Sequence, residues 1–310
     1  MKLETTNIFK NLSLSKSNNL IILDEKQLKQ LQKVILSIAD DIITICEENN
    51  IVYHLTGGSA LGAIRHKGFI PWDDDLDIDV GRKDYDKLIK LIKDKYREKY
   101  YIHNPYNLEG FNIPATQIRL KGTKVRGCND ADPSQCGAYI DIAIMENTFN
   151  NKFLRGIHGT ISLMLGFIVS CRRFARDKRY LLDMVKEDEE ISKTFKVKIQ
   201  IGKIMSFLTL RRWILIYNGW NKICKNYNSK YVTVPTGRKH FFGELYERKD
   251  FYESKTAEFE GRKWKVPKEY DKYLKHMYGD YMKIPDRDKV EKHVLLEFDL
   301  KGENNNERTN

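Results

Sequence analysis

The sequence predicts an α/β protein built around a mixed sheet. Apolar residues recur every three or four positions from Leu28 to Ile45, which is the spacing of an amphipathic helix. Apolar and polar residues alternate from Asp75 to Val80 and again from Ala115 to Lys121, which is the period of a strand. A helix followed by strands, a second helix and further strands is typical of α/β and α+β mixed sheets.

The first predicted helix has a recognisable start and end. Asp24, followed three residues later by Gln27, resembles a capping box, and the helical spacing stops near Asn49-Asn50. The apolar run from Ile51 to Leu55 follows at once and is expected to be a buried strand.

The remaining elements of the predicted core follow in order. The small residues Gly57-Gly58-Ser59 predict a turn after the strand, and residues 60–67 predict a short helix. A helix is also expected around Tyr85 to Ile92, and another from Tyr270 that ends at Gly279. Further strands are expected at residues 100–103, 115–121 and 139–144.

Five aspartates lie within seven residues, at positions 73, 74, 75, 77 and 79. Like charges this close repel one another unless solvent or cations surround them. The alternation with apolar residues places Asp75, Asp77 and Asp79 on one face of a strand and predicts that the apolar residues are buried on the other. Adjacent carboxylates are ligands that hard cations such as Mg²⁺ accept.

The aspartates have two other interpretations. An EF-hand loop needs Gly at its sixth position and Glu at its twelfth. Counting from Asp75, these positions hold Val80 and Asp86, so an EF-hand is excluded. A solvated acidic turn without a ligand stays open as the alternative to a cation site.

A phosphate site and a third carboxylate are expected nearby. The Gly57-Gly58-Ser59 turn precedes a helix, and backbone N–H groups at a helix start bind phosphate. Asp141 stands between Ile140 and Ile142 in an apolar strand, where burial without a partner is costly. Asp141 is therefore either a buried hydrogen-bond acceptor or part of the same site. A phosphate cradle followed by carboxylates predicts metal-assisted phosphoryl chemistry.

Several short motifs between residues 50 and 295 occur together. They are Gly57-Gly58-Ser59, Leu61-Gly62-Ala63, Arg65-His66-Lys67-Gly68-Phe69-Ile70-Pro71-Trp72-Asp73-Asp74-Asp75, Asp77, Gly122-Thr123, Tyr139-Ile140-Asp141-Ile142, Phe259-Glu260-Gly261 and Tyr278-Gly279-Asp280-Tyr281-Met282. In these motifs the chain resembles the LicD family of phosphotransferases, which includes bacterial phosphocholine transferases and the fukutin-related proteins. The resemblance implies a nucleotidyltransferase (polymerase β-like) core with an inserted or C-terminal helical subdomain.

The resemblance also implies roles for individual residues. Asp75, Asp77 and Asp141 would be the catalytic metal ligands and would hold one or two Mg²⁺ or Mn²⁺ ions. Asp79 departs from the family core and is a further candidate ligand. The donor phosphates would be bound by Gly57, Gly58, Ser59, Arg65, Lys67 and Arg119.

The implied reaction moves an alcohol phosphate, with phosphocholine as the first candidate, from a CDP-activated alcohol. The acceptor would be a hydroxyl of a cell-surface glycan or of its lipid-linked precursor, and CMP would be released. A nucleotidyltransferase that moves the nucleotide itself would use the same site and stays open. A non-catalytic nucleotide- or glycan-binding module is disfavoured because the carboxylate set is complete.

Composition narrows the partners of the protein. The 310 residues include 54 Lys and Arg against 43 Asp and Glu, a net charge of +11 that favours an anionic partner. The sequence has no compact basic run with interleaved aromatic residues, so a nucleotide or an anionic membrane surface is expected rather than nucleic acid.

The cysteines predict neither a zinc site nor a disulfide framework. They number five, form no CxxC pair and stand at 46, 128, 136, 171 and 224. Cys128 and Cys136 flank a polar loop, and two free thiols in a reducing cytoplasm are favoured over a bond between them.

Apolar helices rich in Arg and Lys are predicted from Phe153 to Trp220. The apolar run from Ile157 to Ser170 is shorter than the about 20 residues that span a bilayer. It is interpreted either as a buried helix of an inserted subdomain, which its length favours, or as an in-plane membrane helix with basic flanks. The flanking basic residues are Arg155, Arg172 and Arg173, with Arg211 and Arg212 beside a second apolar segment at 204–220.

Five segments are predicted. They are a polar N-terminal segment, a catalytic core, a helical subdomain, a C-terminal region that completes the cleft and a disordered tail, at residues 1–22, 23–150, 151–235, 236–300 and 301–310. His293 in the fourth segment could contact phosphate or acceptor, although a lone His is more often structural. The N-terminus lacks the apolar stretch of a signal peptide, so a cytoplasmic protein is expected, with peripheral contact at the inner membrane face as an option.

Overall fold

The protein is described here by a computed structural model. The structure describes residues 21–106, 113–127, 130, 133–186, 188–286 and 295–300. The predictions for residues 1–20, for Cys128, for His293 and for the tail at 301–310 lie outside the described residues.

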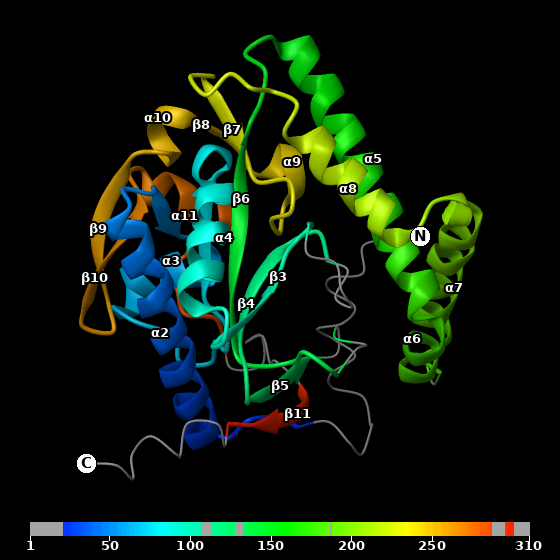
Figure 1. The fold of residues 1–310 in the computed structure, drawn as a ribbon, viewed down its shortest axis with the longest axis horizontal. Helices are drawn as coiled ribbons and strands as arrows, with labels where there is room; N and C mark the ends of the chain where they lie inside the picture. Colours follow the sequence, from blue (N-terminus) through cyan, green and yellow to red (C-terminus); the bar gives the residue numbers. More distant parts are fainter. Residues whose placement is uncertain are drawn as a thin grey trace.

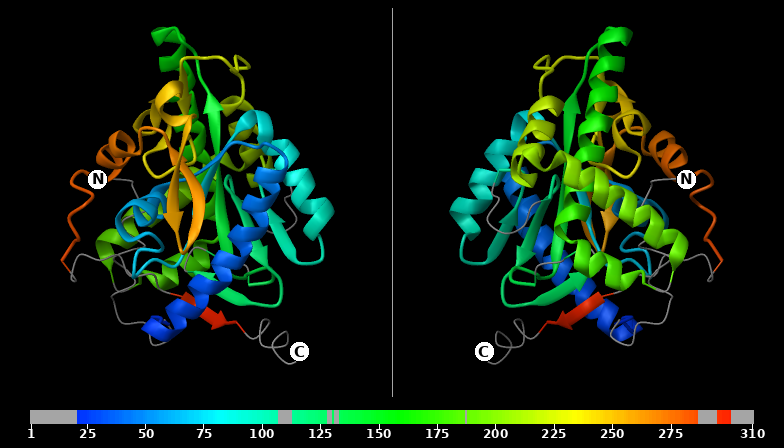
Figure 2. Two further views of the ribbon diagram at one scale, coloured as in Figure 1. Left: turned by 90° about the vertical axis from the view of Figure 1, so that its left-hand side faces the viewer. Right: turned by 90° about the vertical axis from the view of Figure 1, so that its right-hand side faces the viewer.

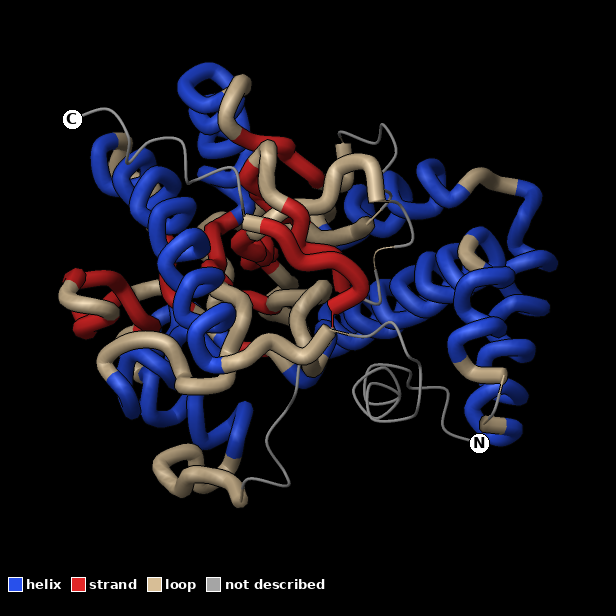
Figure 3. The backbone as a smooth tube through the Cα atoms, turned by 90° about the horizontal axis from the view of Figure 1, so that it is seen from below, coloured by secondary structure: helices blue, strands red, loops and turns tan. Residues whose placement is uncertain are grey.

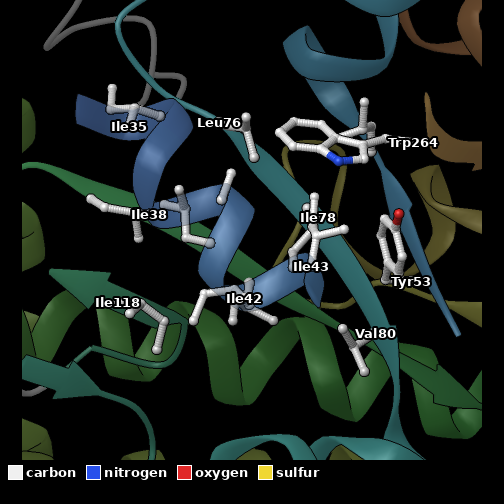
Figure 4. Packing of buried hydrophobic residues seen from close by; sticks show 14 of the residues in the cluster. Ile35, Ile38, Ile42, Ile43, Tyr53, Leu76, Ile78, Val80, Ile118 and Trp264 are labelled. Atoms are coloured by element: carbon white, nitrogen blue, oxygen red, sulfur yellow. The ribbon is translucent and has the colours of Figure 1, made fainter. Parts of the chain in front are cut away.

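The first described helix confirms its predicted start and end. Helix α2 spans Glu25–Glu48, with the Asp24 side chain accepting a hydrogen bond from the Gln27 N–H at 2.7 Å. The Gln27 side chain accepts one from the Asp24 N–H at 3.0 Å, which completes the capping box. One face of α2 is fully buried against the sheet, and Figure 4 shows its isoleucines facing Ile78 and Val80 of one strand and Leu76 just before that strand.

The main sheet is mixed, as predicted. Its strands follow the spatial order β1-β2-β6-β4-β3, and β7 and β8 extend it beyond the end of β6 (Figure 1). Strands β2 and β6 run parallel, whereas the other pairs are antiparallel. The strands span Tyr53–Leu55 (β1), Asp77–Gly81 (β2), Tyr100–His103 (β3), Thr116–Leu120 (β4), Tyr139–Asn147 (β6), Tyr231–Thr233 (β7) and Leu245–Glu247 (β8).

Shorter elements cover and extend this sheet. Helix α11 ends at Gly279, as predicted, where a φ of +71° suits a residue without a side chain. The other elements are α3 (Gly57–His66), α4 (Arg82–Tyr96), α9 (His240–Gly243), α10 (Arg248–Phe251), α11 (Tyr270–Tyr278), the hairpin of β9 (Ser254–Phe259) with β10 (Arg262–Pro267), and the pair of β5 (Lys124–Gly127) with β11 (Leu295–Asp299).

The helices that follow β6 form a group of their own. They lie on the opposite side of the sheet from β9 and β10, and they stand in front of the strands in the right-hand view of Figure 2. Seen from below in Figure 3, they extend sideways from the strands. They are α5 (Lys152–Arg176), α6 (Lys178–Met184), α7 (Glu189–Ile204), the 3-10 turn η1 (Met205–Phe207) and α8 (Leu210–Asn221).

Two apolar clusters hold these helices together, separate from the main core. One joins α5 to α8 through Leu165, Ile168, Trp213 and Ile214, and the other joins α5 to α6 and α7. We propose that this group is the helical subdomain. The chain rejoins the sheet at β7, so the proposed subdomain ends about Lys230 rather than at residue 235.

The helix is longer than the apolar run from Ile157 to Ser170 that the sequence shows. Helix α5 has 25 residues, because the helix continues through the basic residues at both ends of that run. Among the described helices, α5 is the one that is long and apolar enough to cross a membrane, judged by length and composition alone. About a third (33%) of its most apolar stretch is buried. His158 and Ser162 on α5 hydrogen-bond to Trp220 and Asn221 of α8, so one face of this helix packs against the protein.

Candidate active site

Helix α3 begins directly after β1, without the intervening turn that the sequence predicts. Thr56 is the N-cap, and Gly57, Gly58 and Ser59 form the first turn of the helix. The first N–H groups of a helix have no acceptor within it and carry partial positive charge. Three small residues therefore bring a set of backbone donors to the end of β1.

Strand β2 is attached to this first turn. The Asp77 N–H donates to Oγ of Ser59 at 2.8 Å, and the Thr56 N–H donates to the Asp77 carbonyl at 3.1 Å. The Ser59 side chain is 3% exposed. The hydroxyl of Ser59 therefore fixes the start of β2, whereas its predicted role was to hold a donor phosphate.

Two carboxylates approach the glycines of α3 closely. A Cβ added at Gly58 would lie 2.5 Å from Oδ2 of Asp73, and one added at Gly57 would lie 2.9 Å from Oδ2 of Asp77. Gly57 also has a φ of +54°, which disfavours other residues. The glycines thus allow acidic side chains to reach the positive end of the helix.

Asp77 and Asp141 meet on neighbouring strands. They are register partners of the parallel pair β2 and β6, and the Asp141 N–H donates to the Leu76 carbonyl at 2.9 Å. Gln117 on β4 is the register partner of Asp141 on the other side and hydrogen-bonds to its carboxylate. Both carboxyl groups are half-buried at the same level of the sheet.

The loop before β2 brings three more carboxylates to this place. One carboxylate oxygen from each of Asp73, Asp74 and Asp75 lies within 4.8 Å of the other two. Among the described residues, these three form the group of acidic side chains that lie this close together. The Gln32 side chain of α2 donates to the Asp73 carbonyl at 2.8 Å and anchors the loop. The sequence places Asp75 on β2 itself, but the strand begins only at Asp77.

The electrostatics of the site reflect this crowding. Burial raises the pKa of Asp77 well above its usual range, and the charges of Asp75 and Asp141 raise it further. Burial and then Asp75 raise the pKa of Asp141 to about 7, although the hydrogen bond from Gln117 lowers it. A bound cation would offset the repulsion between these carboxylates. Their oxygen atoms are the ligand type that Mg²⁺ and Mn²⁺ accept, so the residues present fit a divalent ion.

Asp79 lies deeper than the other aspartates. It is 2% exposed, accepts a hydrogen bond from Oγ1 of Thr56 at 3.3 Å, and has its pKa raised by burial and by Glu244. The predicted burial of the apolar residues of β2 is confirmed for Ile78 and Val80, and Asp79 on the other face is buried as well. We leave Asp79 out of the proposed ligand set.

Arg65 and Lys67 lie at the opposite end of α3 from the glycines. Arg65 donates to the Tyr281 carbonyl at 2.6 Å, so it holds the segment after α11. Lys67 caps α3 in a left-handed conformation, and its exposed ammonium lies 3.8 Å from the Glu258 carboxylate. About 14 Å of helix separates these residues from Gly57. We therefore do not retain them as donor contacts.

Arg119 serves the site through another residue. It is 1% exposed and its guanidinium donates to both carboxylate oxygens of Asp130 at 3.1–3.2 Å. It also donates to Oε1 of Gln117 at 2.7 and 3.1 Å, and Gln117 in turn hydrogen-bonds to Asp141. Arg119 is thus a positioning residue for Gln117, whereas the sequence suggested a phosphate contact.

Three further residues that sequence reasoning did not assign lie at the site. Tyr273 of α11 accepts a hydrogen bond from the Gly57 N–H at 2.8 Å. The Tyr278 hydroxyl would lie 3.8 Å from a Cβ at Gly57, and burial followed by Asp77 raises its pKa. Arg238 is exposed and close enough to lower the pKa of Tyr278. The motif at Tyr278 was a signal for this proximity, but nothing in the sequence pattern distinguished Arg238.

One of the C-terminal motifs has a structural role. Glu260 lies at the tip of the β9–β10 hairpin with a φ of +48°, and its carboxylate accepts a hydrogen bond from the Phe69 N–H at 3.1 Å. The Glu260 carboxylate occupies the space beside Gly68 that a Cβ would fill. This contact explains why the two motifs, far apart in sequence, occur together.

The protein is therefore a mixed α/β protein in which clustered carboxylates lie beside the glycine-rich N-terminus of helix α3. Residues 50–128 match the family model described as "LicD/FKTN/FKRP, nucleotidyltransferase domain". The resemblance to the LicD family that the motifs predict is therefore confirmed over residues 50–128.

Similarity to individual proteins extends further along the chain. The chain is 28% identical over 289 residues to the lipopolysaccharide cholinephosphotransferase LicD of Haemophilus influenzae, covering 87% of this chain and 97% of that protein. An uncharacterized protein of Rickettsia prowazekii is 42% identical over 52 residues, which is 17% of this chain and 20% of that one.

Proposed function

We propose that this protein is a metal-dependent transferase that moves an alcohol phosphate from a CDP-activated donor to a glycan hydroxyl and releases CMP. Phosphocholine is the first candidate for the group moved. The observation that carries the proposal is the similarity, over 87% of the chain, to a lipopolysaccharide cholinephosphotransferase. The arrangement of Asp77, Asp141 and the α3 glycines supports a phosphoryl-transfer site within a nucleotidyltransferase-like core.

A divalent cation would be held by Asp75, Asp77 and Asp141, with Asp73 and Asp74 beside them. When bound, Mg²⁺ or Mn²⁺ would neutralise charge on the donor diphosphate. This need for positive charge explains why the chain gathers carboxylates that repel one another in its absence.

The protein would supply the remaining steps itself. The N–H groups of Gly58 and Ser59 would donate to donor phosphate oxygens, because the Gly57 N–H already donates to Tyr273. Arg238 is the cation that we propose for the same phosphates in place of Arg65, Lys67 and Arg119.

Asp141 would help to deprotonate the acceptor hydroxyl, either directly or through the cation that it holds. The acceptor oxygen would then bond to the phosphorus bearing the alcohol. The bond from this phosphorus to the bridging oxygen would break, and the electron pair would leave with CMP.

The acceptor that we propose is a glycan of the cell surface, or its lipid-linked precursor, reached on the cytoplasmic side. Lipopolysaccharide is the acceptor class in the printed name of the Haemophilus relative, and a teichoic acid or capsule precursor would offer the same hydroxyl chemistry.

The test is a panel of CDP-alcohols carrying choline, ethanolamine, ribitol or glycerol, with mass-spectrometric detection of both products. Transfer of phosphocholine with release of CMP would support the proposal. Transfer of the cytidylyl group with release of free phosphocholine would assign the nucleotidyltransferase reaction instead. Absence of turnover with every donor, in enzyme that binds Mg²⁺, would leave a nucleotide-binding module.

A further inference from the structure

The helices α5, α7 and α8 expose an unusual amount of apolar surface. Ten of the sixteen large apolar side chains that are exposed in the described part of the chain lie between Phe153 and Ile223. Isolated exposed apolar residues are normal, whereas a concentration on one group of helices marks an interaction surface.

The same helices carry the positive charge of the protein. Residues 151–230 contain 17 Lys and Arg against 6 Asp and Glu, and the rest of the chain contains 37 Lys and Arg against 37 Asp and Glu. The net charge of +11 therefore arises entirely in the helical group. A partner for this region must tolerate many cations and supply negative charge.

Apolar and basic side chains meet most closely where α7 ends and α8 begins. Ile204 is 72% exposed and Phe207 is 70% exposed, and exposed basic residues stand on both sides of them. We call this surface the η1–α8 patch; it consists of Lys203, Ile204, Phe207, Arg211, Arg212, Leu215 and Ile216, all exposed.

The patch is held firmly by buried contacts beneath it. The Phe207 ring packs edge-on against Trp213, with 5.5 Å between ring centroids, and Trp213 Nε1 donates to the Met205 carbonyl at 2.9 Å. Oγ1 of Thr209 accepts a hydrogen bond from the Arg212 N–H at 3.2 Å and caps α8. The exposure of Phe207 is therefore built into the fold.

The structure also corrects which arginines flank the apolar helices. Arg155 stacks on the Tyr231 ring at 4.2 Å, and Arg172 donates to the Gly202 carbonyl at 2.7 Å between α5 and α7. Both are engaged inside the protein and are half-buried. Arg211 and Arg212, by contrast, are exposed on α8.

We propose that the η1–α8 patch docks on an anionic membrane surface. Exposed Phe and Ile side chains flanked by Lys and Arg match the interfacial zone of a bilayer, where apolar groups enter the acyl boundary and cations meet lipid phosphates. Docking lies in the plane of the membrane, because α5 and α8 remain joined through the hydrogen bond of Ser162 to Asn221. The proposal does not depend on the proposed function, since binding requires no turnover.

The test is co-sedimentation of the full chain with vesicles of phosphatidylcholine alone or mixed with phosphatidylglycerol. We expect binding to the mixed vesicles at low salt and loss of most binding at about 1 M salt, where the Debye length is about 3 Å. The double variants Arg211→Glu/Arg212→Glu and Ile204→Ser/Phe207→Ser should each reduce the partition coefficient at least about tenfold.

Matched controls separate the patch from general charge and hydrophobicity. Lys29→Glu/Lys33→Glu on exposed positions of α2 makes the same charge change, and Ile22→Ser removes another exposed apolar side chain; both should bind as the parent does. Unchanged circular dichroism would show that the patch variants are folded. Failure to bind mixed vesicles at low salt, or equal weakening by the controls, overturns the proposal. Dimerisation that the patch variants abolish, measured by sedimentation velocity, would assign the surface to a second copy and also overturn it.

Discussion

Asp77 and Asp141 are register partners on adjacent parallel strands, and burial and the charge of Asp141 raise the pKa of Asp77. The Asp77 N–H is held by Ser59, and the Asp141 carboxylate is held by Gln117, so both positions are fixed by neighbouring elements. Two carboxylates placed rigidly together in a protected site are unfavourable for stability and useful for binding a cation.

The first prediction is a trade between activity and stability at this pair. Asp77→Asn and Asp141→Asn should each lower turnover by more than about a hundredfold, because each removes a charge that the transition state requires. Measured in EDTA at pH 8, each variant should be more stable than the parent by on the order of 1–2 kcal/mol, because a repelled buried charge is gone. Activity assays and thermal unfolding check the two effects. The exposed α4 variant Asp94→Asn is the control, and a destabilised Asp77→Asn protein would contradict the argument.

The second prediction concerns the glycine start of α3. Gly58→Ala should weaken the affinity for CDP-choline at least about tenfold, because the added Cβ meets Oδ2 of Asp73 and blocks backbone approach. Gly219→Ala on α8 is the control, since its Cβ would meet nothing within 4 Å and should slightly favour the helix. Calorimetric titration in Mg²⁺ measures both. Equal donor affinity in the two variants would place the phosphates elsewhere.

The third prediction separates positioning from catalysis at Gln117. The hydrogen bond from Gln117 lowers the pKa of Asp141, so Gln117→Met should raise that pKa. Asp141 would then ionise at higher pH, and the acidic limb of the kcat/KM profile should shift to higher pH. A profile that falls in height without moving would mean that Gln117 is only structural. Lys87→Met on exposed α4 provides a comparison that should leave the profile unchanged.

The fourth prediction is a pH dependence of stability from His54. This residue is fully buried, Nε2 lies 3.1 Å from Oγ of Ser254, and burial followed by Lys265 lowers its pKa to about 3. Below pH 6.5, His54 binds a proton in the unfolded chain but stays neutral in the folded protein. The free energy of unfolding therefore falls as pH drops from about 6.5 towards 3.

The measurement compares the parent with His54→Gln by urea unfolding at pH 7.5 and pH 5. The slope from one such histidine is about 1.4 kcal/mol per pH unit, so the stability difference between parent and variant should shift by about 2 kcal/mol against the parent at the lower pH. Subtracting the variant removes the contributions of the carboxyl groups. A difference that stays constant with pH would show that His54 is protonated or solvated in the folded protein.

Much of the site follows from the sequence alone. Period-two and period-3.6 patterns predict α2, β2, β4 and β6 within a few residues, because alternation and helical spacing are local properties. The capping box at Asp24 and the helix end at Gly279 are likewise local. The crowding of aspartates and the acidic residue in an apolar strand also pointed to Asp77 and Asp141, because unpaired buried charge is costly wherever the chain folds.

Only the tertiary structure decided where the basic residues point. Arg65 hydrogen-bonds to the segment after α11, and Arg119 hydrogen-bonds to Asp130 and Gln117. The sequence pattern does not predict these contacts, because they depend on how the chain folds in three dimensions. The raised pKa of Asp79 likewise depends on tertiary structure, because burial and then Glu244, far along the chain, raise it. The exposure of Phe207 also depends on which side of α8 packs against α5. Local sequence determines which elements form, whereas contacts between distant elements determine which side chains are free to act.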